Sequence, residues 1–340
     1  MTRGGGAGPA RRQDLAVVAL GGGHGLAASL GALRRVTTAL TAVVTVADNG
    51  GSSGRLRDEL RVLPPGDLRQ ALAALCGDDE WGRTWAAVLQ HRFTSSGALH
   101  DHAVGNLLIV ALWELLGDAV GGLAWVARLL GAQGQVLPMS AVPLDITASV
   151  RGCDPADPQA LTTVRGQVEA ATAAGEVVEV ALEPHDPPAC PEALHAIRAA
   201  DWVVLGPGSW FTSVIPHLLV PDLFTELHRT AARRLVVLNL TPQEGETAGF
   251  SPAHHLEVLA RHAPLLRIDI VLADAGHVDD RPALERAAAT LGAKLVVDQV
   301  AAADGSARHD QLRLAAAYER IFERVETSRT ERVPPSPERA

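Results

Sequence analysis

The apolar and polar positions of the first fifty residues predict a strand, a helix and a second strand. Residues 15–20 are a continuous apolar run bounded by turn residues, which is typical of a short buried strand. Leu26, Leu30 and Leu33 then recur at helical spacing. Residues 41–46 are apolar and β-branched, which favours a second strand.

The same pattern extends over the rest of the chain in three parts. Residues 66–131 have helical periodicity, which glycines divide into about four helices. An antiparallel β insertion is favoured by three short β-type runs, at residues 144–150, 162–168 and 177–182. Further strands are predicted at residues 202–205, 235–240, 268–273 and 295–297, with helices around 191–200, 218–231, 253–261, 283–291 and 310–325. Strands that alternate with helices predict an α/β fold with a doubly wound, mostly parallel, Rossmann-like sheet.

Length and composition are consistent with one large domain. The chain has 340 residues, of which 47% are hydrophobic and 20% charged, so it can bury a full core. We expect a single α/β domain over residues 14–325, with a helical segment at 67–131 and a β-rich insertion at 135–183. Residues 1–13 and 326–340 lack such patterns and are expected to be a flexible and a disordered tail.

Charge and cysteine content narrow the class of protein. A net charge of -9 argues against bulk binding of nucleic acid, which needs a basic surface. Cys76, Cys153 and Cys190 are widely spaced and form no metal-binding or disulfide pattern, so a cytoplasmic protein is expected. No apolar run reaches the roughly 18 residues of a membrane span, so no membrane insertion is expected.

A glycine-rich turn joins the first predicted strand to its helix. It consists of Gly21, Gly22, Gly23, His24 and Gly25. Glycines let backbone N–H groups approach an anion, and a helix N-terminus adds a favourable dipole. The turn therefore predicts a phosphate site, although a tight strand–helix connection has the same composition.

A second loop of this kind follows the predicted strand at residues 202–205. Gly206, Gly208 and Ser209 lie at its carboxyl end, where ligands of open α/β sheets bind. Together, two such loops predict a site for a diphosphate, or for a phosphate and a sugar. The alternative is again a tight connection between a strand and a helix.

Polar side chains also follow the second and a later strand. After residues 41–46 come a carboxylate, an amide, two hydroxyls and a guanidinium, which belong to Asp48, Asn49, Ser52, Ser53 and Arg55. Asn239 lies at the end of residues 235–240, and Gln243 and Thr247 follow them. These three side chains are candidates for hydrogen bonding to a uracil or to a sugar; for Thr247 the alternative is helix capping.

Longer motifs around these residues resemble a known family. They read GGGHGLAASLGAL, VVTVADNGGSSGRLRDELRVLPPGDLRQALAAL, HAVGNLLIVAL, DWVVLGPGSWFTSVIPHLLV and a late RHD. They resemble the YvcK-type gluconeogenesis-factor family within the CofD-like superfamily, whose enzymatic branch is 2-phospho-L-lactate transferase. The resemblance covers residues 15–323. It implies a cytosolic protein that binds a UDP-sugar, typically UDP-N-acetylglucosamine, and links carbon metabolism to cell-envelope synthesis and cell shape.

The resemblance also assigns roles to single residues. It implies that Asn106, in the motif HxxGN, faces the ligand. It also implies that Arg308, in the motif RHD, makes a bidentate contact with the diphosphate. The chain departs from the family at His24, where threonine is common, and at Asn49, where a second acid is usual. His24 could donate to a phosphate oxygen, and the alternative is a solvent-exposed loop histidine. An amide at position 49 weakens a hard-cation site, so we expect no metal and no required cofactor.

Two functions remain in competition. The first is a non-catalytic regulator that binds a nucleotide sugar. The motif VADNGGSSGRLR resembles the sequences of the regulator branch of the superfamily. The alternative is a Mg²⁺-dependent transferase of the 2-phospho-L-lactate type that acts on a deazaflavin acceptor. A Rossmann dehydrogenase is disfavoured because the first loop reads GGGHG rather than GxGxxG. No catalytic residue stands out. The sequence is compatible with a homodimer and identifies no protein partner.

Overall fold

The computed structural model describes residues 12–154, 156–243 and 246–330. Its strands are β1 (Arg12–Gly21), β2 (Thr37–Val44), β3 (Gln135–Pro138), β4 (Asp145–Arg151), β5 (Leu161–Arg165), β6 (Glu176–Glu183), β7 (Trp202–Leu205), β8 (Arg233–Val237), β9 (Ile270–Asp274) and β10 (Lys294–Asp298). The helices are α1 (Gly23–Val36), α2 (Gly51–Leu60), α3 (Gly66–Ala74), α4 (Glu80–Gln90), α5 (Val104–Leu116), α6 (Ala119–Leu130), α7 (Gln167–Ala171), α8 (Pro191–Ala199), η1 (Trp210–Val214), α9 (Ile215–Leu218), α10 (Pro221–Arg229), α11 (Pro252–His262), η2 (Ala275–His277), α12 (Arg281–Thr290) and α13 (Gln311–Thr330).

A parallel sheet of seven strands forms the centre of the fold, in the order β10-β9-β8-β7-β1-β2-β3. From β1 the chain moves outward through β2 to β3, and from β7 it moves the other way through β8 to β10. Right-handed crossovers place the connecting helices of the two halves on opposite faces. The order therefore reverses between β1 and β7, and the predicted doubly wound α/β fold is confirmed. Ligands of such sheets bind at this switch point, at the carboxyl ends of the strands.

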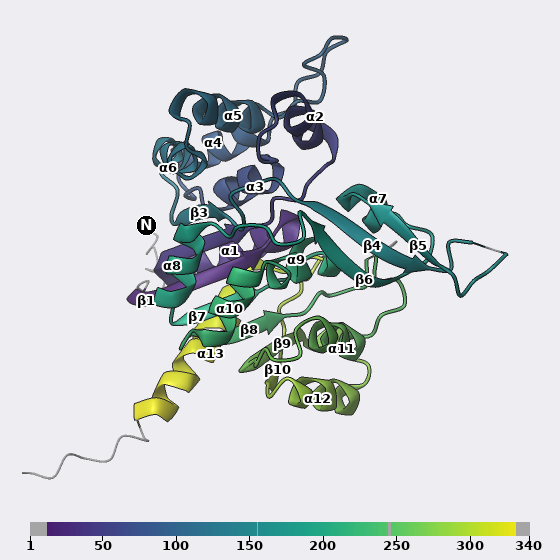
Figure 1. Ribbon diagram of the computed structural model, residues 1–340. Coiled ribbons are helices and arrows are strands. Elements are labelled where there is room, and N and C mark those ends of the chain that lie inside the picture. The colour runs from purple at the N-terminus through teal and green to yellow at the C-terminus, as the bar shows by residue number, and fades with distance from the viewer. Residues whose placement is uncertain (1–11, 155, 244–245, 331–340) are drawn as a thin grey trace, which may run out of the picture.

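The smaller sheet is antiparallel, in the order β5-β4-β6, and it projects away from the main sheet together with α7 (Figure 1). Its strands agree with the predicted insertion. One predicted boundary is wrong, because the insertion was expected to begin at residue 135. Instead β3 pairs in parallel with β2 and forms the edge of the main sheet.

Three further expectations differ from the structure. The segment after the second strand was predicted to be a loop, but α2 begins at Gly51. At the two ends, β1 already begins at Arg12 and α13 continues to Thr330, so the expected tails overlap with regular structure. The remainder of both tails lies outside the described residues.

Apolar side chains hold α1 against the sheet, and one buried hydrogen bond fixes α13 on α1. Leu26, Leu30 and Leu33 are fully buried, as their helical spacing predicts. Ser29 Oγ and Tyr318 Oη lie 2.7 Å apart in the interface between α1 and α13. This packing fixes the N-terminus of α1 at the switch point. Across the described part of the chain, no helix is both long and apolar enough to cross a bilayer.

Candidate functional site

The two glycine-rich loops meet at the switch point of the sheet. A Cβ atom added to Gly25 would lie 2.3 Å from the carbonyl oxygen of Pro207, so α1 can start this close to the second loop only with glycine there. The loops after β1 and β7, predicted from separate parts of the sequence, therefore form one crevice.

Asp67, at the start of α3, lies beneath the first glycine loop. A Cβ atom on Gly22 would lie 2.5 Å from Asp67 Oδ2, and the N–H of Gly23 donates to this carboxyl group. Asp67 Oδ2 and the nearby Thr45 Oγ1 are buried without a partner among the described residues. Burial raises the pKa of Asp67 from 3.8 to about 7, and the charge of Asp48 raises it as well.

Asp48 supplies the second carboxylate of the crevice. Its Oδ1 accepts a hydrogen bond of 2.9 Å from Gly50 N, while its Oδ2 faces Gly66, the residue before Asp67. The two carboxyl groups therefore converge between the first loop and α2. Among the described residues, no group of three or more His, Cys, Asp or Glu side chains is arranged to hold a metal ion.

The N-terminus of α1 offers backbone donors to this crevice. Its cap residue, Gly22, makes no side-chain cap, and the first turn contains no acidic residue. Because Gly23 N–H is bonded to Asp67, the next amides, those of His24 and Gly25, remain; they have no acceptor within the helix. These amides and the helix dipole are what an anion needs.

The second loop already holds an anion, the carboxylate of Glu246. Two groups at the start of η1 donate to this carboxylate. Ser209 Oγ donates to Glu246 Oε1 at 2.6 Å, and Phe211 N donates to the same oxygen at 2.9 Å. Glu246 is buried, and burial raises its pKa while these hydrogen bonds oppose the rise. The donors of the second loop are therefore occupied in this structure, and the amides of the first loop are the ones available to a phosphate.

The predicted residues that follow β8 mostly bond to the protein itself. Asn239 Oδ1 accepts from Gly208 N, and Asn239 Nδ2 donates to Gly208 O, both at 2.8 Å. Thr247 is buried and its Oγ1 accepts from Gln243 N. Gln243 Oε1 is buried without a partner among the described residues, so it is the polar atom of this segment that a ligand could still use.

A buried polar network takes up three of the other predicted residues. Ser52 Oγ lies 3.0 Å from His102 Nδ1 and accepts from Asn106 Nδ2 at 3.0 Å. Asn106 Oδ1 accepts from Arg69 Nε at 2.8 Å. Ser53 Oγ accepts from the backbone N–H of residue 66. These side chains hold α2, α3 and α5 together behind the crevice.

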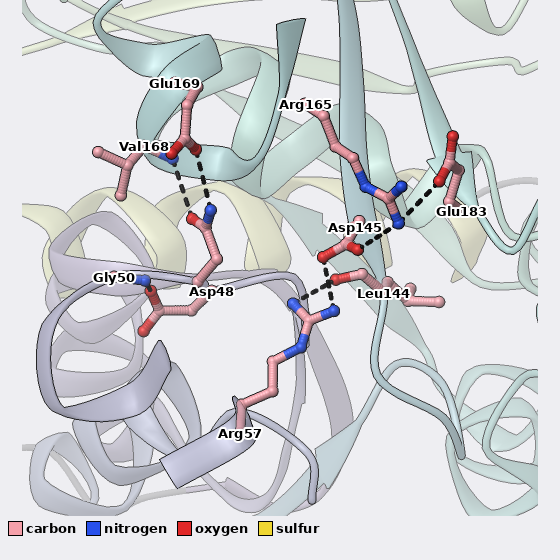
Figure 2. A network of polar contacts seen from close by, with 10 residues as sticks. Asp48, Gly50, Arg57, Leu144, Asp145, Arg165, Val168, Glu169 and Glu183 are labelled. Atoms are coloured by element: carbon pink, nitrogen blue, oxygen red, sulfur yellow. Dashed lines mark hydrogen bonds and ion pairs between the residues drawn. The ribbon is translucent and has the colours of Figure 1, made fainter. Parts of the chain in front are cut away.

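Asn49 and Arg55 connect their segment to other parts of the fold. Asn49 Nδ2 donates to Glu169 Oε2 at 2.9 Å, and Asn49 Oδ1 accepts from Val168 N at 3.1 Å, so its amide is bonded to α7. Figure 2 shows Val168 and Glu169 facing the segment that carries Asp48. Arg55 donates to His100 O at 2.8 Å. Asn49 is thus an anchor for the insertion.

Two more of the predicted residues are exposed, as Arg55 is. His24 lies on the surface of the first turn of α1, next to the free amides. The side chain of Arg308 is 76% exposed and pairs with Asp304 at 3.2 Å. Its role toward a diphosphate stays a prediction.

The structure therefore brings together one part of the predicted set. The crevice contains Gly21, Gly22, Gly23, His24, Gly25, Asp48, Gly206, Gly208 and Ser209. Sequence reasoning missed Asp67 and Glu246. Asp67 directly follows the rigid Pro-Pro-Gly turn that places it under the glycine loop, and this was the available signal. Glu246 had none, because its partners lie about 35 residues earlier.

Comparison with known proteins identifies relatives over most of the chain. The family model described as 2-phospho-L-lactate transferase CofD matches residues 17–313. A putative gluconeogenesis factor from Mycobacterium tuberculosis is 54% identical over 311 residues, which are 91% of this chain and 90% of that protein. A gluconeogenesis factor from Halalkalibacterium halodurans is 36% identical over 264 residues, 78% of this chain and 79% of that protein. A crystal structure of a UPF0052 family member from Bacillus halodurans superposes with a TM-score of 0.80 at 32% identity, covering 90% of this chain and 99% of the other.

Proposed function

The chain is a YvcK-type member of the CofD family, and from this premise we propose that it binds a UDP-sugar, typically UDP-N-acetylglucosamine, as a non-catalytic regulator. The observation that carries the proposal is the crevice at the switch point. There the uncapped N-terminus of α1 offers backbone donors at the carboxyl ends of β1 and β7.

The crevice is suited to binding a diphosphate in its ground state. Backbone amides and a helix dipole can hold a phosphate without a metal ion. Gln243, whose Oε1 is buried without a described partner, is a candidate for reading the uracil. The proposed role includes a link between carbon metabolism and cell-envelope synthesis and cell shape in the cytoplasm. The gluconeogenesis-factor name of the relatives supports the first part of this role.

Calorimetric titration of the purified protein tests the proposal. We expect UDP-N-acetylglucosamine to bind more tightly than UDP-glucose or GDP, and to raise the melting temperature at saturation. Ligand at about 100 times its dissociation constant should add about 2.7 kcal/mol of apparent stability. The absence of both binding heat and a thermal shift at saturating UDP-N-acetylglucosamine would overturn the proposal.

A second candidate function is a Mg²⁺-dependent transferase that acts on a deazaflavin acceptor. It is favoured by the convergence of Asp48 and Asp67, since Mg²⁺ is commonly held by one or two carboxylates together with substrate phosphates. The two carboxylates would hold the ion, which would neutralise charge on the transferred group. Mg²⁺-dependent consumption of the nucleotide sugar in the presence of a deazaflavin acceptor, followed by phosphorus NMR, would favour this function.

A further inference from the structure

A polar cavity lies beside the crevice, between the main sheet and the insertion. It has a volume of about 550 Å³, within the range of small-molecule sites. Its walls come from the second half of α2, the start of β4 and the turn between β5 and α7. Figure 2 shows residues of all three walls, with Arg57 from α2, Asp145 from β4, and Arg165 and Glu169 from either side of the turn between β5 and α7.

The cavity adjoins the glycine-rich crevice through a shared wall. Asn49, which lines the cavity, directly follows Asp48 of the crevice. A Cβ atom on Gly50 would lie 3.1 Å from Val168 Cγ2, so α7 packs closely on this wall. The same helix contacts η1, which begins where the second glycine loop ends. The cavity and the crevice are therefore adjacent in the fold, with the segment that follows β2 common to both.

The charges that line the cavity balance one another. Arg57 Nη2 lies 2.5 Å from Asp145 Oδ1, and Arg165 Nη2 lies 2.8 Å from Asp145 Oδ2. The full set is three arginines and three acids, Arg57, Arg61, Arg165, Asp58, Asp145 and Glu169. A balanced set of donors and acceptors suits a neutral molecule with many hydroxyl groups better than a second anion.

Two details favour a sugar over a nucleobase. The described residues that line the cavity include no aromatic ring, so a base has no face to stack on. Arg61, the C-cap of α2, has the left-handed φ of 58°, which glycine or asparagine adopts more easily. Holding an arginine in this conformation costs conformational free energy of the backbone, and it places an arginine in the lining of the cavity.

We propose that this cavity holds the sugar of the nucleotide sugar, with Asp58 and Glu169 accepting from its hydroxyl groups and Arg61 donating to them. The inference rests on the proposed function and deepens it, because it assigns the discrimination between UDP and a UDP-sugar to α2 and the insertion. The diphosphate remains at the N-terminus of α1.

The test compares UDP with UDP-N-acetylglucosamine by calorimetry in the full-length protein. The double variant Asp58→Ala, Arg61→Gly removes two exposed side chains of the cavity, and glycine suits the backbone at position 61. Glu59→Ala, on the same helix but outside the cavity lining, is the matched control. Circular dichroism melts confirm that each variant is folded.

We expect the double variant to bind UDP as the unaltered protein does, while its preference for UDP-N-acetylglucosamine over UDP falls roughly tenfold. The control should keep the full preference. An unchanged preference in the double variant, or no preference in the unaltered protein, overturns the sugar cavity but leaves UDP binding in place. Failure of both ligands to bind the unaltered protein overturns the proposed function and the cavity together.

Discussion

Asp67 combines two properties that a purely structural acid rarely has. Its carboxyl group accepts from the N–H of Gly23 and so orders the glycine loop. Its other oxygen, Oδ2, is buried without a described partner, and burial together with the Asp48 charge raises the pKa to about 7. An acid that is hard to ionise therefore lies directly under the proposed phosphate site, where a negative charge would repel the ligand.

Asp67 should make the stability of the protein depend on pH. The folded pKa of about 7 lies above the ordinary 3.8, so between these values the unfolded chain ionises while the folded protein keeps its proton. Stability should therefore fall as pH rises from about 4 to about 7, by on the order of 4 kcal/mol from this group. Asp67→Asn keeps an acceptor for the N–H of Gly23, and its stability should not decrease with pH in this way. Urea unfolding at pH 8 should therefore give a larger free energy of unfolding for Asp67→Asn than for the unaltered protein.

The comparison needs a control with the same change of charge. Asp279→Asn, at an exposed position outside the crevice, serves this purpose. If Asp67→Asn and the unaltered protein keep the same difference in unfolding free energy at pH 4 and pH 8, Asp67 is ionised in the folded state at both values.

At the scale of elements, α7 depends on its contact with the segment after β2. It has five residues, Gln167–Ala171, which is too short for a helix to be stable by itself. Asn49 bonds both to the N–H of Val168 in its first turn and to the side chain of Glu169. The helix is therefore held in place by a residue of the main domain, 119 positions before Val168 in the chain.

Replacing Asn49 should loosen α7 and leave the main sheet intact. Asn49→Ala removes both hydrogen bonds. Asn49→Asp keeps an acceptor for the N–H of Val168 but replaces the bond to Glu169 by repulsion between two carboxylates, and we expect this repulsion to make it the more damaging change. We expect faster amide hydrogen exchange in α7 in both variants, in this order. Arg151→Ala breaks an exposed pair with Glu176 elsewhere in the insertion and is the control. Unchanged exchange in Asn49→Asp would contradict this role.

Elements with a strong local pattern could be predicted from the sequence. The alternation of strands and helices predicts the main sheet, and glycine-rich turns predict both loops of the crevice. By contrast, α2 begins with Gly51-Ser52-Ser53-Gly54, which has a poor helix propensity, and tertiary contacts of its two serines hold it. The partners of Asn49 could not be predicted either, because a polar pair 120 residues apart leaves no local signal.

At the scale of the whole molecule, the reversal of strand order decides where charge accumulates. It brings three acids, Asp48, Asp67 and Glu246, to one edge of the sheet. The carboxylate of Glu246 is compensated by donors at the start of η1. Burial holds the pKa of Asp67 at about 7, so below that pH its carboxyl group adds no negative charge to this edge.

This distribution of charge predicts that nucleotide-sugar binding depends on pH rather than on Mg²⁺. With a chelator present, we expect UDP-N-acetylglucosamine to bind at pH 6, where Asp67 is neutral. Between pH 6 and pH 8 the affinity should fall about tenfold, because ionised Asp67 adds a negative charge beneath the phosphate. Titration calorimetry at both pH values measures the fall, and Asp67→Asn should abolish it.

The opposite outcome has a distinct meaning, since a cation could take the place of the proton on Asp67. If binding fails in chelator at pH 6 and Mg²⁺ restores it, the carboxylates of Asp48 and Asp67 act as metal ligands. Phosphorus NMR then decides between the two functions. With a deazaflavin acceptor and Mg²⁺ present, a regulator leaves the sugar nucleotide intact over long incubation, whereas a transferase passes a group from it to the acceptor. Neutralising charge on the moving phosphoryl group is what a metal adds to such a transfer.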